Sequence, residues 1–171
     1  MSDLLSGASH APGASGARFQ FRPMRLEDAR EAGRWRYPSE YAIYDLDPLA
    51  LTLTALLRAP LRAFGFHALA VGMPGDPMIS VFSFIKRGVD VEIGVGMRPD
   101  LMGRGLGLGL MLSGMDYARA RLHPATFSLT VATFNRRAIT VYERAGFVPG
   151  AITRVRLNGQ FYDSMAMSRA A

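Results

Sequence analysis

The hydrophobic and polar positions of this chain predict a series of strands and helices. Short apolar runs punctuated by glycine, proline and aspartate are typical of strands. They predict strands at residues 19–24, 66–72, 78–87, 89–97 and 126–133. The last part of the chain, residues 148–168, is predicted to form a β-hairpin, because Asn158-Gly159 is the strongest short signal for a hairpin turn.

Four segments carry the start and stop signals of helices. They are residues 26–37, residues 47–59, a segment from a glycine-rich stretch to about residue 121, and residues 135–147. Pro48 suits the first turn of the second helix, and Asn135 and Gly146 suit the two ends of the fourth. The element order β-α-α-β-β-β-α-β-α-β-β predicts a mixed sheet with helices on both faces.

The composition fits a single domain. The chain has 171 residues, of which 49% are hydrophobic, enough for one core. Residues 1–17 are rich in Gly, Ala and Ser and are predicted to be a disordered leader, so the domain is expected at 18–171. No run approaches the ~20 apolar residues that span a bilayer, and the N-terminus lacks a signal-peptide pattern. We therefore expect a cytoplasmic protein with no membrane partner.

The charged residues limit the classes of binding partner that we expect. A net charge of +6 and a pI near 10.3 predict attraction to anions, such as nucleic acid or a phosphorylated small molecule. The Lys and Arg residues are dispersed, which disfavours nucleic acid. The absence of cysteine excludes disulfides, thiolate metal sites and a cysteine nucleophile. The histidines, His10, His67 and His123, are too scattered for a metal site of the HExxH kind, so we expect no metal.

Residues 98–112, RPDLMGRGLGLGLML, place a cluster of glycines at the entrance of an apolar helix. Each glycine costs about 1 kcal/mol relative to alanine inside a helix, so a purely structural helix would avoid them. An anion bound to the N–H groups of a helix N-terminus would explain bare backbone there. The stretch lacks the lysine of a Walker A loop, and its alternating glycines do not match GxGxxG. A flexible glycine-rich turn is the alternative.

The remaining pattern, R-x-x-G-x-G at residues 104–109, resembles the pyrophosphate-binding turn of the GNAT superfamily of N-acetyltransferases. About 30 residues later, Asn135–Phe147 resembles the family's next segment, with Asn at the helix start, Tyr142 seven residues on, and Gly-Phe at the end. The resemblance extends over roughly residues 19–168. It implies an α/β (α+β) fold with a central mixed, mostly antiparallel sheet of six or seven strands, flanked by about four helices.

The resemblance also implies that acetyl-CoA is the cosubstrate. Its pantetheine arm would follow the strand near Gly96 and Met97, with Asn135 beside it and the Tyr142 hydroxyl near the sulfur. Two helical turns separate Asn135 from Tyr142, so both side chains project from one helix face. A helix cap for Asn135 and a core position for Tyr142 are the structural alternatives. The pyrophosphate would bind at Arg104, Gly105, Leu106, Gly107, Leu108 and Gly109.

An acceptor amine is mostly protonated at neutral pH, so a base is needed. Glu92, which alternates with apolar residues on its strand, is the candidate; a structural or salt-bridged carboxylate is the alternative. Family members usually bind the acceptor through the first helices and the loop between them. Candidate acceptor contacts there are Trp35, Tyr37, Tyr41, Tyr44 and Asp45, for which core packing is the alternative.

These observations predict an N-acetyltransferase that transfers an acetyl group to a primary amine of a small molecule or peptide, by direct attack on the thioester. Two other functions stay open. One is a CoA-binding regulatory module that has lost catalysis, and the other is an acetyltransferase acting on a ribosomal or tRNA component. The sequence does not identify the amine or decide whether another acyl-CoA is used, and it leaves a homodimer open.

Overall fold

The structure is a computed structural model that describes residues 19–57, 61, 65–73, 77–157 and 159–171. The predicted leader and Asn158 of the predicted hairpin turn lie outside these residues.

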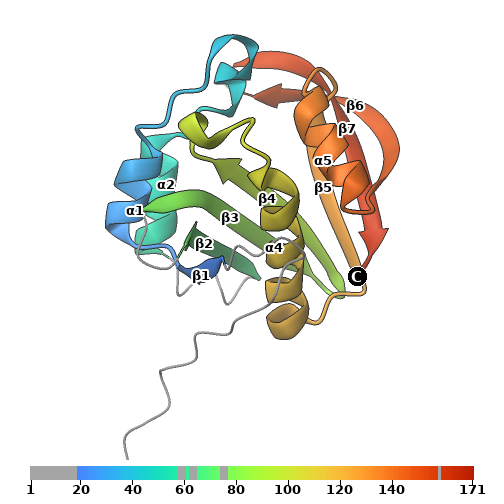
Figure 1. Ribbon diagram of the computed structural model, residues 1–171, viewed down its shortest axis with the longest axis horizontal. Coiled ribbons are helices and arrows are strands. Elements are labelled where there is room, and N and C mark those ends of the chain that lie inside the picture. Colours follow the sequence, from blue (N-terminus) through green and yellow to red (C-terminus); the bar gives the residue numbers. More distant parts are fainter. Residues whose placement is uncertain (1–18, 58–60, 62–64, 74–76, 158) are drawn as a thin grey trace, which may run out of the picture.

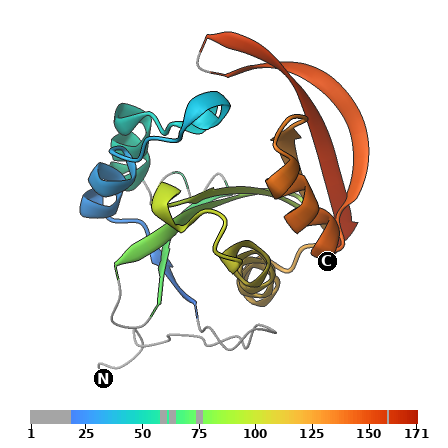
Figure 2. The ribbon, with the colours of Figure 1, turned by 45° about the horizontal axis from the view of Figure 1, so that its top comes forward.

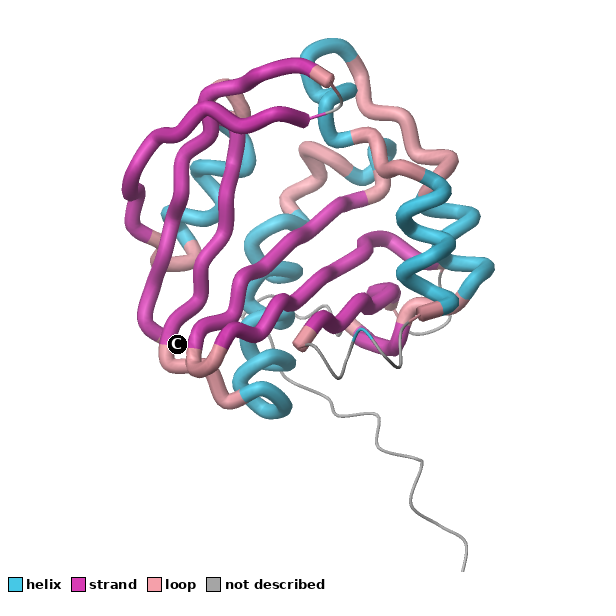
Figure 3. The backbone as a smooth tube through the Cα atoms, turned by 180° about the vertical axis from the view of Figure 1, so that it is seen from behind, coloured by secondary structure: helices cyan, strands magenta, loops and turns pink. Residues whose placement is uncertain are grey.

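Seven strands form one mixed sheet in the order β1-β2-β3-β4-β5-β7-β6 (Figure 1). Neighbouring strands are antiparallel except for β4 and β5, which are parallel. This confirms the expected mixed, mostly antiparallel sheet. Figure 3 shows it from behind, with β1 at one edge and the long β6–β7 hairpin at the other. The strands are β1 (Gln20–Pro23), β2 (Phe66–Gly72), β3 (Met78–Arg87), β4 (Asp90–Met97), β5 (Thr126–Ala132), β6 (Val148–Leu157) and β7 (Gln160–Ala170).

Helices cover both faces of the sheet, as the element order predicted (Figure 2). The α-helices that the structure describes are α1 (Leu26–Ala32), α2 (Pro48–Leu56), α4 (Leu106–Leu122) and α5 (Arg136–Arg144). Two 3-10 helices, η1 (Ser39–Tyr44) and η2 (Pro99–Leu101), lie in the connections. Helices α1 and α2 pack on one face, and α4 and α5 pack on the other.

The first helix is shorter than predicted: it ends at Ala32 rather than near Tyr37. Gly33 takes the C-cap position, and Pro38 disfavours helical backbone at the residue before it. Trp35 and Tyr37 are both buried in the non-helical segment that follows. Residues two apart cannot share one face of a helix, so burying both favours a helix that ends early.

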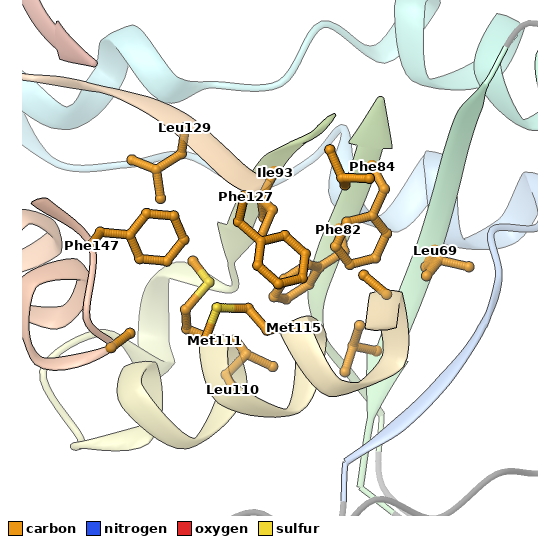
Figure 4. Close-up of a cluster of buried hydrophobic side chains, with 14 of the residues drawn as sticks. Leu69, Phe82, Phe84, Ile93, Leu110, Met111, Met115, Phe127, Leu129 and Phe147 are labelled. Atoms are coloured by element: carbon orange, nitrogen blue, oxygen red, sulfur yellow. The ribbon is translucent and has the colours of Figure 1, made fainter. Parts of the chain in front are cut away.

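Alternate side chains of β3 pack into different hydrophobic clusters on the two faces of the sheet. Phe82 and Phe84 belong to the larger cluster beneath α4 and α5, whereas Val81 belongs to the smaller cluster beneath α1 and α2. Figure 4 shows Met111 and Met115 of α4 directed toward the rings of the sheet. This packing fixes α4, and with it the glycine-rich turn at its N-terminus, against the centre of the sheet.

We expect Gly114→Ala to destabilise the fold. A Cβ at Gly114 would lie 2.5 Å from Cε1 of the fully buried Phe82 ring. Overpacking of this kind costs about 1–3 kcal/mol, so the urea midpoint should fall. The matched control is Gly109→Ala on the same helix, where the new Cβ would lie 3.6 Å from Phe19. Helix propensity should leave that variant unchanged or about 1 kcal/mol more stable, and equal losses in both variants would contradict this account.

Candidate active site

The parallel strands β4 and β5 pair only where they begin. Asp90–Glu92 is in register with Thr126–Ser128, and no pairing continues beyond. From there the two strands diverge, as Figures 1 and 2 show. We call the region between their diverging ends the split. Past Glu92, the backbone groups that face the split need partners from outside the β4–β5 ladder.

The strand register decides which backbone groups face the split. The N–H of Arg98 donates to the carbonyl of Ile79 on β3. Because bonding alternates along an antiparallel pair, Gly96 turns its backbone groups toward β3, whereas Met97 turns its groups toward the split. In agreement, the Gly96 carbonyl accepts a hydrogen bond from the Ser80 hydroxyl at 2.8 Å. Of the two predicted backbone contacts, Met97 therefore faces the split.

The same reasoning applies to β5. The N–H of Thr133 donates to the carbonyl of Asp163 on β7, at 2.9 Å. Ala132, one residue earlier, therefore turns its N–H away from β7 and toward the split.

Two tyrosine hydroxyls bond to these split-facing backbone groups. The Tyr37 hydroxyl donates to the Met97 carbonyl at 2.8 Å, and the Ala132 N–H donates to the Tyr44 hydroxyl at 3.1 Å. Residues 37–45, which include η1, thus connect the ends of both strands; we call them the clasp. The Asp45 carboxylate closes the clasp by accepting the N–H of Tyr37 at 2.8 Å.

The remaining predicted acceptor residues have different surroundings. Trp35 is 6% exposed and packs in the core beneath α1 and α2. Tyr41 is partly buried, with its ring centroid 6.0 Å from that of Phe134 and 4.5 Å from the Arg137 guanidinium. Sequence reasoning did not single out Ala132, Phe134 or Arg137, because only the fold brings β5 and its following loop to the clasp.

The predicted anion-binding turn is exposed and leads directly into the first turn of α4. Gly103 and Gly105 have φ of 77° and 78°, a conformation that L residues rarely adopt. Gly105 is the N-cap of α4 and has no side chain to offer the first turn. The N–H groups of Leu106–Leu108 therefore have no intrahelical partner, and they lie at the positive end of the helix dipole beside the exposed Arg104.

The next glycine, Gly107 inside α4, has a packing role. A Cβ at Gly107 would lie 3.1 Å from Cγ2 of Val141 on α5, so Gly107 allows α4 and α5 to approach closely. Nη2 of Arg137, in the first turn of α5, lies 4.0 Å from the Met102 sulfur. The N-termini of the two helices consequently lie side by side (Figure 1).

Helix α5 carries the other predicted cofactor contacts. Asn135 is its N-cap, and its side-chain oxygen accepts the Ala138 N–H at 3.2 Å. Tyr142 is partly buried against the core, with its ring centroid 6.2 Å from that of Phe147. Burial raises the pKa of Tyr142, and the nearby Tyr44 raises that pKa further. Tyr44 of the clasp therefore lies within electrostatic range of Tyr142 of α5.

Glu92 is the last residue of β4 that pairs with β5. Val91 and Ile93 on either side point into the core beneath α4, so the Glu92 side chain points to the α1–α2 side of the sheet. Among the described residues, none forms a hydrogen bond or ion pair with the Glu92 carboxylate. Glu92 lies five residue steps, about 16 Å of strand, before Met97, so Glu92 is at the closed end of the split.

Other kinds of site have less support within the described ranges. No group of three or more His, Asp or Glu side chains there could hold a metal ion. A small hollow is lined by Phe19, Phe21, Ser113 and Tyr117 among others, along the later turns of α4. In this part of the chain, none of the helices has the length and apolar character needed to cross a membrane.

We expect the clasp to make stability sensitive to alkaline pH. Burial raises the pKa of Tyr37 from 10.0 to about 12. Between these two pH values the unfolded chain loses the phenolic proton of Tyr37, while the folded protein keeps it. The contribution of Tyr37 to the free energy of unfolding is therefore complete below pH 10. It falls by about 1.4 kcal/mol per pH unit as the pH rises toward 12. Urea unfolding from pH 9 to 12 should show a shallower loss for Tyr37→Phe. An unchanged slope in that variant, with Tyr162→Phe as the control, would contradict the assignment.

The sequence of the chain is similar to those of known proteins. A family model described as an acetyltransferase (GNAT) domain matches residues 18–148. The chain is 36% identical over 108 residues to a mycothiol acetyltransferase of Nocardioides sp. and 32% identical over 106 residues to one of Nocardia farcinica. These matches cover 61% and 62% of this chain but 34% and 31% of those proteins, so the chain spans about a third of their length.

Solved structures have the same fold. A spermidine N-acetyltransferase from Vibrio cholerae, in complex with CoA and spermine, matches with a TM-score of 0.73 at 20% identity, over 89% of this chain and 95% of that one. A ribosomal-protein-S5-alanine acetyltransferase from Vibrio fischeri matches with a TM-score of 0.69 at 15% identity, over 89% and 92% of the two chains. With the family match over most of its length, the chain belongs to the GNAT family of acetyltransferases.

Proposed function

We propose that the chain is an N-acetyltransferase that uses acetyl-CoA to acetylate a primary amine of a small molecule or peptide. The observation that carries the proposal is the meeting of three elements at the split. The chain runs from the free end of β4 through η2 into the bare N-terminus of α4, and Gly107 in the first turn of α4 lies against Val141 of α5, the residue before Tyr142. The similar proteins named above act, by their names, on mycothiol, spermidine or an alanine of ribosomal protein S5.

Acetyl-CoA would supply the activated acetyl thioester, and the chain would bind it at both ends. The N–H groups of Leu106–Leu108, with Arg104 beside them, suit the pyrophosphate. The pantetheine arm would then follow the free edge of β4, where the N–H of Met97 faces the split while its carbonyl bonds to Tyr37. Donors on this edge could also stabilise the oxyanion that forms when the thioester is attacked.

Glu92 and Tyr142 are assigned different roles, one toward the amine and the other toward the departing sulfur. Glu92, at the closed end of the split, would remove the amine proton through a water molecule before attack on the thioester. A CoA thiol has a pKa of about 8.5. Because burial raises the pKa of Tyr142 above its ordinary value of 10.0, full proton transfer from this tyrosine to the thiolate is uphill. Tyr142 is therefore assigned a hydrogen bond to the departing sulfur.

The acceptor would approach beside the clasp. Asp45 bonds to Tyr37, and Asp47 caps α2 by accepting the Leu49 N–H at 2.8 Å, so both carboxylates have structural partners. Recognition of the acceptor is thus assigned to the side of the clasp where the Tyr41 ring meets the Phe134 ring. Release of CoA thiol with a panel of polyamines, aminoglycosides, amino acids and N-terminal peptides tests the function. Binding of acetyl-CoA without release for any amine would favour a regulatory CoA-binding module.

We expect Gly105→Ala to weaken acetyl-CoA binding. Alanine at a positive φ is strained by about 1–2 kcal/mol, and relief of that strain would turn the first N–H groups of α4 away from the pyrophosphate. Calorimetry should show an affinity loss of about tenfold, or ~1.4 kcal/mol. Gly103→Ala is the matched control, since it has the same φ class and the same open space but lies outside the helix cap. If the two variants bind equally well, the α4 N-terminus is not the pyrophosphate site.

We expect Glu92→Gln to lower kcat/KM by about 10²–10⁴-fold, because the variant keeps the size of the side chain but loses the base. The deficit should shrink as pH rises toward the pKa of the acceptor amine, since more of the amine is then already neutral. A pH–rate profile of both proteins with the best amine of the panel is the measurement. A deficit that does not change with pH would assign Glu92 a structural role.

A further inference from the structure

The two hydroxyls of the clasp have opposite hydrogen-bond polarity. Tyr37 donates its proton to the Met97 carbonyl, so that proton is already used. Tyr44 instead accepts a hydrogen bond from the Ala132 N–H, which leaves its own proton for another acceptor. Within the described part of the chain, no group accepts that proton.

The strand register places the Tyr44 hydroxyl inside the split. Ala132 turns its N–H away from β7 and toward the diverging end of β4, and the Tyr44 oxygen lies 3.1 Å along that direction. The clasp also packs against α5, because the Arg137 guanidinium lies 4.5 Å from the centroid of the Tyr41 ring. Tyr44 and Tyr142, from distant parts of the sequence, therefore belong to two elements that meet beside the split, and Tyr44 lies within electrostatic range of Tyr142.

We propose that Tyr44 is a second hydrogen-bond donor to the thioester sulfur as it leaves, beside Tyr142. This inference rests on the proposed function. Attack by the amine forms the C–N bond and moves the carbonyl electron pair onto oxygen. The nitrogen of this intermediate loses its extra proton to water. Collapse then restores the carbonyl and breaks the C–S bond, and sulfur keeps that electron pair as a thiolate, which takes up a proton from solvent after release. Tyr44 stabilises the new charge through its O–H without giving up the proton, and the Ala132 N–H polarises the hydroxyl for this role.

The first test is the kinetics of Tyr44→Phe, which keeps the ring and removes only the hydroxyl. A hydrogen bond to a charged group predicts that kcat falls by about 10- to 100-fold, while the dissociation constant for acetyl-CoA stays within a few fold. Tyr162→Phe, which loses a hydroxyl bonded to the Gln160 side chain on the β6–β7 hairpin, should keep the wild-type kcat.

Tyr37→Phe separates a donor role from a purely structural one. Each clasp variant loses one hydrogen bond to a split-facing backbone group, so both should lower the melting temperature by similar amounts. A structural role for Tyr44 predicts equal losses of kcat in the two variants. A donor role predicts a clearly larger loss for Tyr44→Phe. Equal losses, or full activity of Tyr44→Phe, would overturn the proposal.

A second test uses CoA itself and needs no acceptor amine. Donors that stabilise the thiolate should make CoA bind more tightly as pH rises through the thiol pKa, whereas acetyl-CoA, which has no thiol, should lack this gain. Calorimetry from pH 6.5 to 9.5 should show the gain in the wild type and a reduced gain in Tyr44→Phe. An unchanged gain would overturn the role of Tyr44. Failure of the wild type to acetylate any amine would instead count against the proposed function.

Discussion

The loss of pairing between β4 and β5 is the constraint on which the rest of the site depends. Parallel strands normally continue their ladder, because an unpaired backbone group in a protein interior costs about 1–3 kcal/mol. Here the ladder has three positions, and beyond it two split-facing groups, the Met97 carbonyl and the Ala132 N–H, bond to tyrosine hydroxyls. Tyrosine suits this task, since its hydroxyl both donates and accepts and its ring can span the distance from a neighbouring segment. In the clasp, the Tyr37 hydroxyl donates a hydrogen bond and the Tyr44 hydroxyl accepts one.

The local signals of the sequence were sufficient for most of the fold. Asn135 caps α5 and Pro48 occupies the first turn of α2, because both effects depend on residues a few positions apart. Leu157 pairs with Gln160, so the predicted hairpin is present and connects through two residues. The end of α1 was placed too late, since the pattern of residues 33–37 did not reveal that tertiary packing would bury both Trp35 and Tyr37.

The candidate site was less accessible to sequence reasoning. Its proposed phosphate-binding turn could be recognised because the glycine spacing is contiguous in sequence. The clasp could not, since it joins Tyr44 to Ala132, 88 residues later in the chain. Four aromatic residues and Asp45 were expected to contact an acceptor. Three of these candidates, Tyr37, Tyr44 and Asp45, form hydrogen bonds within the protein. The sequence identifies the residue types at a site, whereas strand register determines which hydrogen-bonding groups are left available.

The contact between Gly107 and Val141 ties the position of α4 to the position of α5. A single missing methyl group sets the spacing of α4 and α5, because the backbone of one helix rests on a side chain of the other. The turn that would hold a phosphate and the helix that carries Tyr142 cannot then be adjusted separately. A change in the volume of either contact residue would alter the reach from the first turn of α4 to the Tyr142 hydroxyl, and so the length of acyl donor that fits between them.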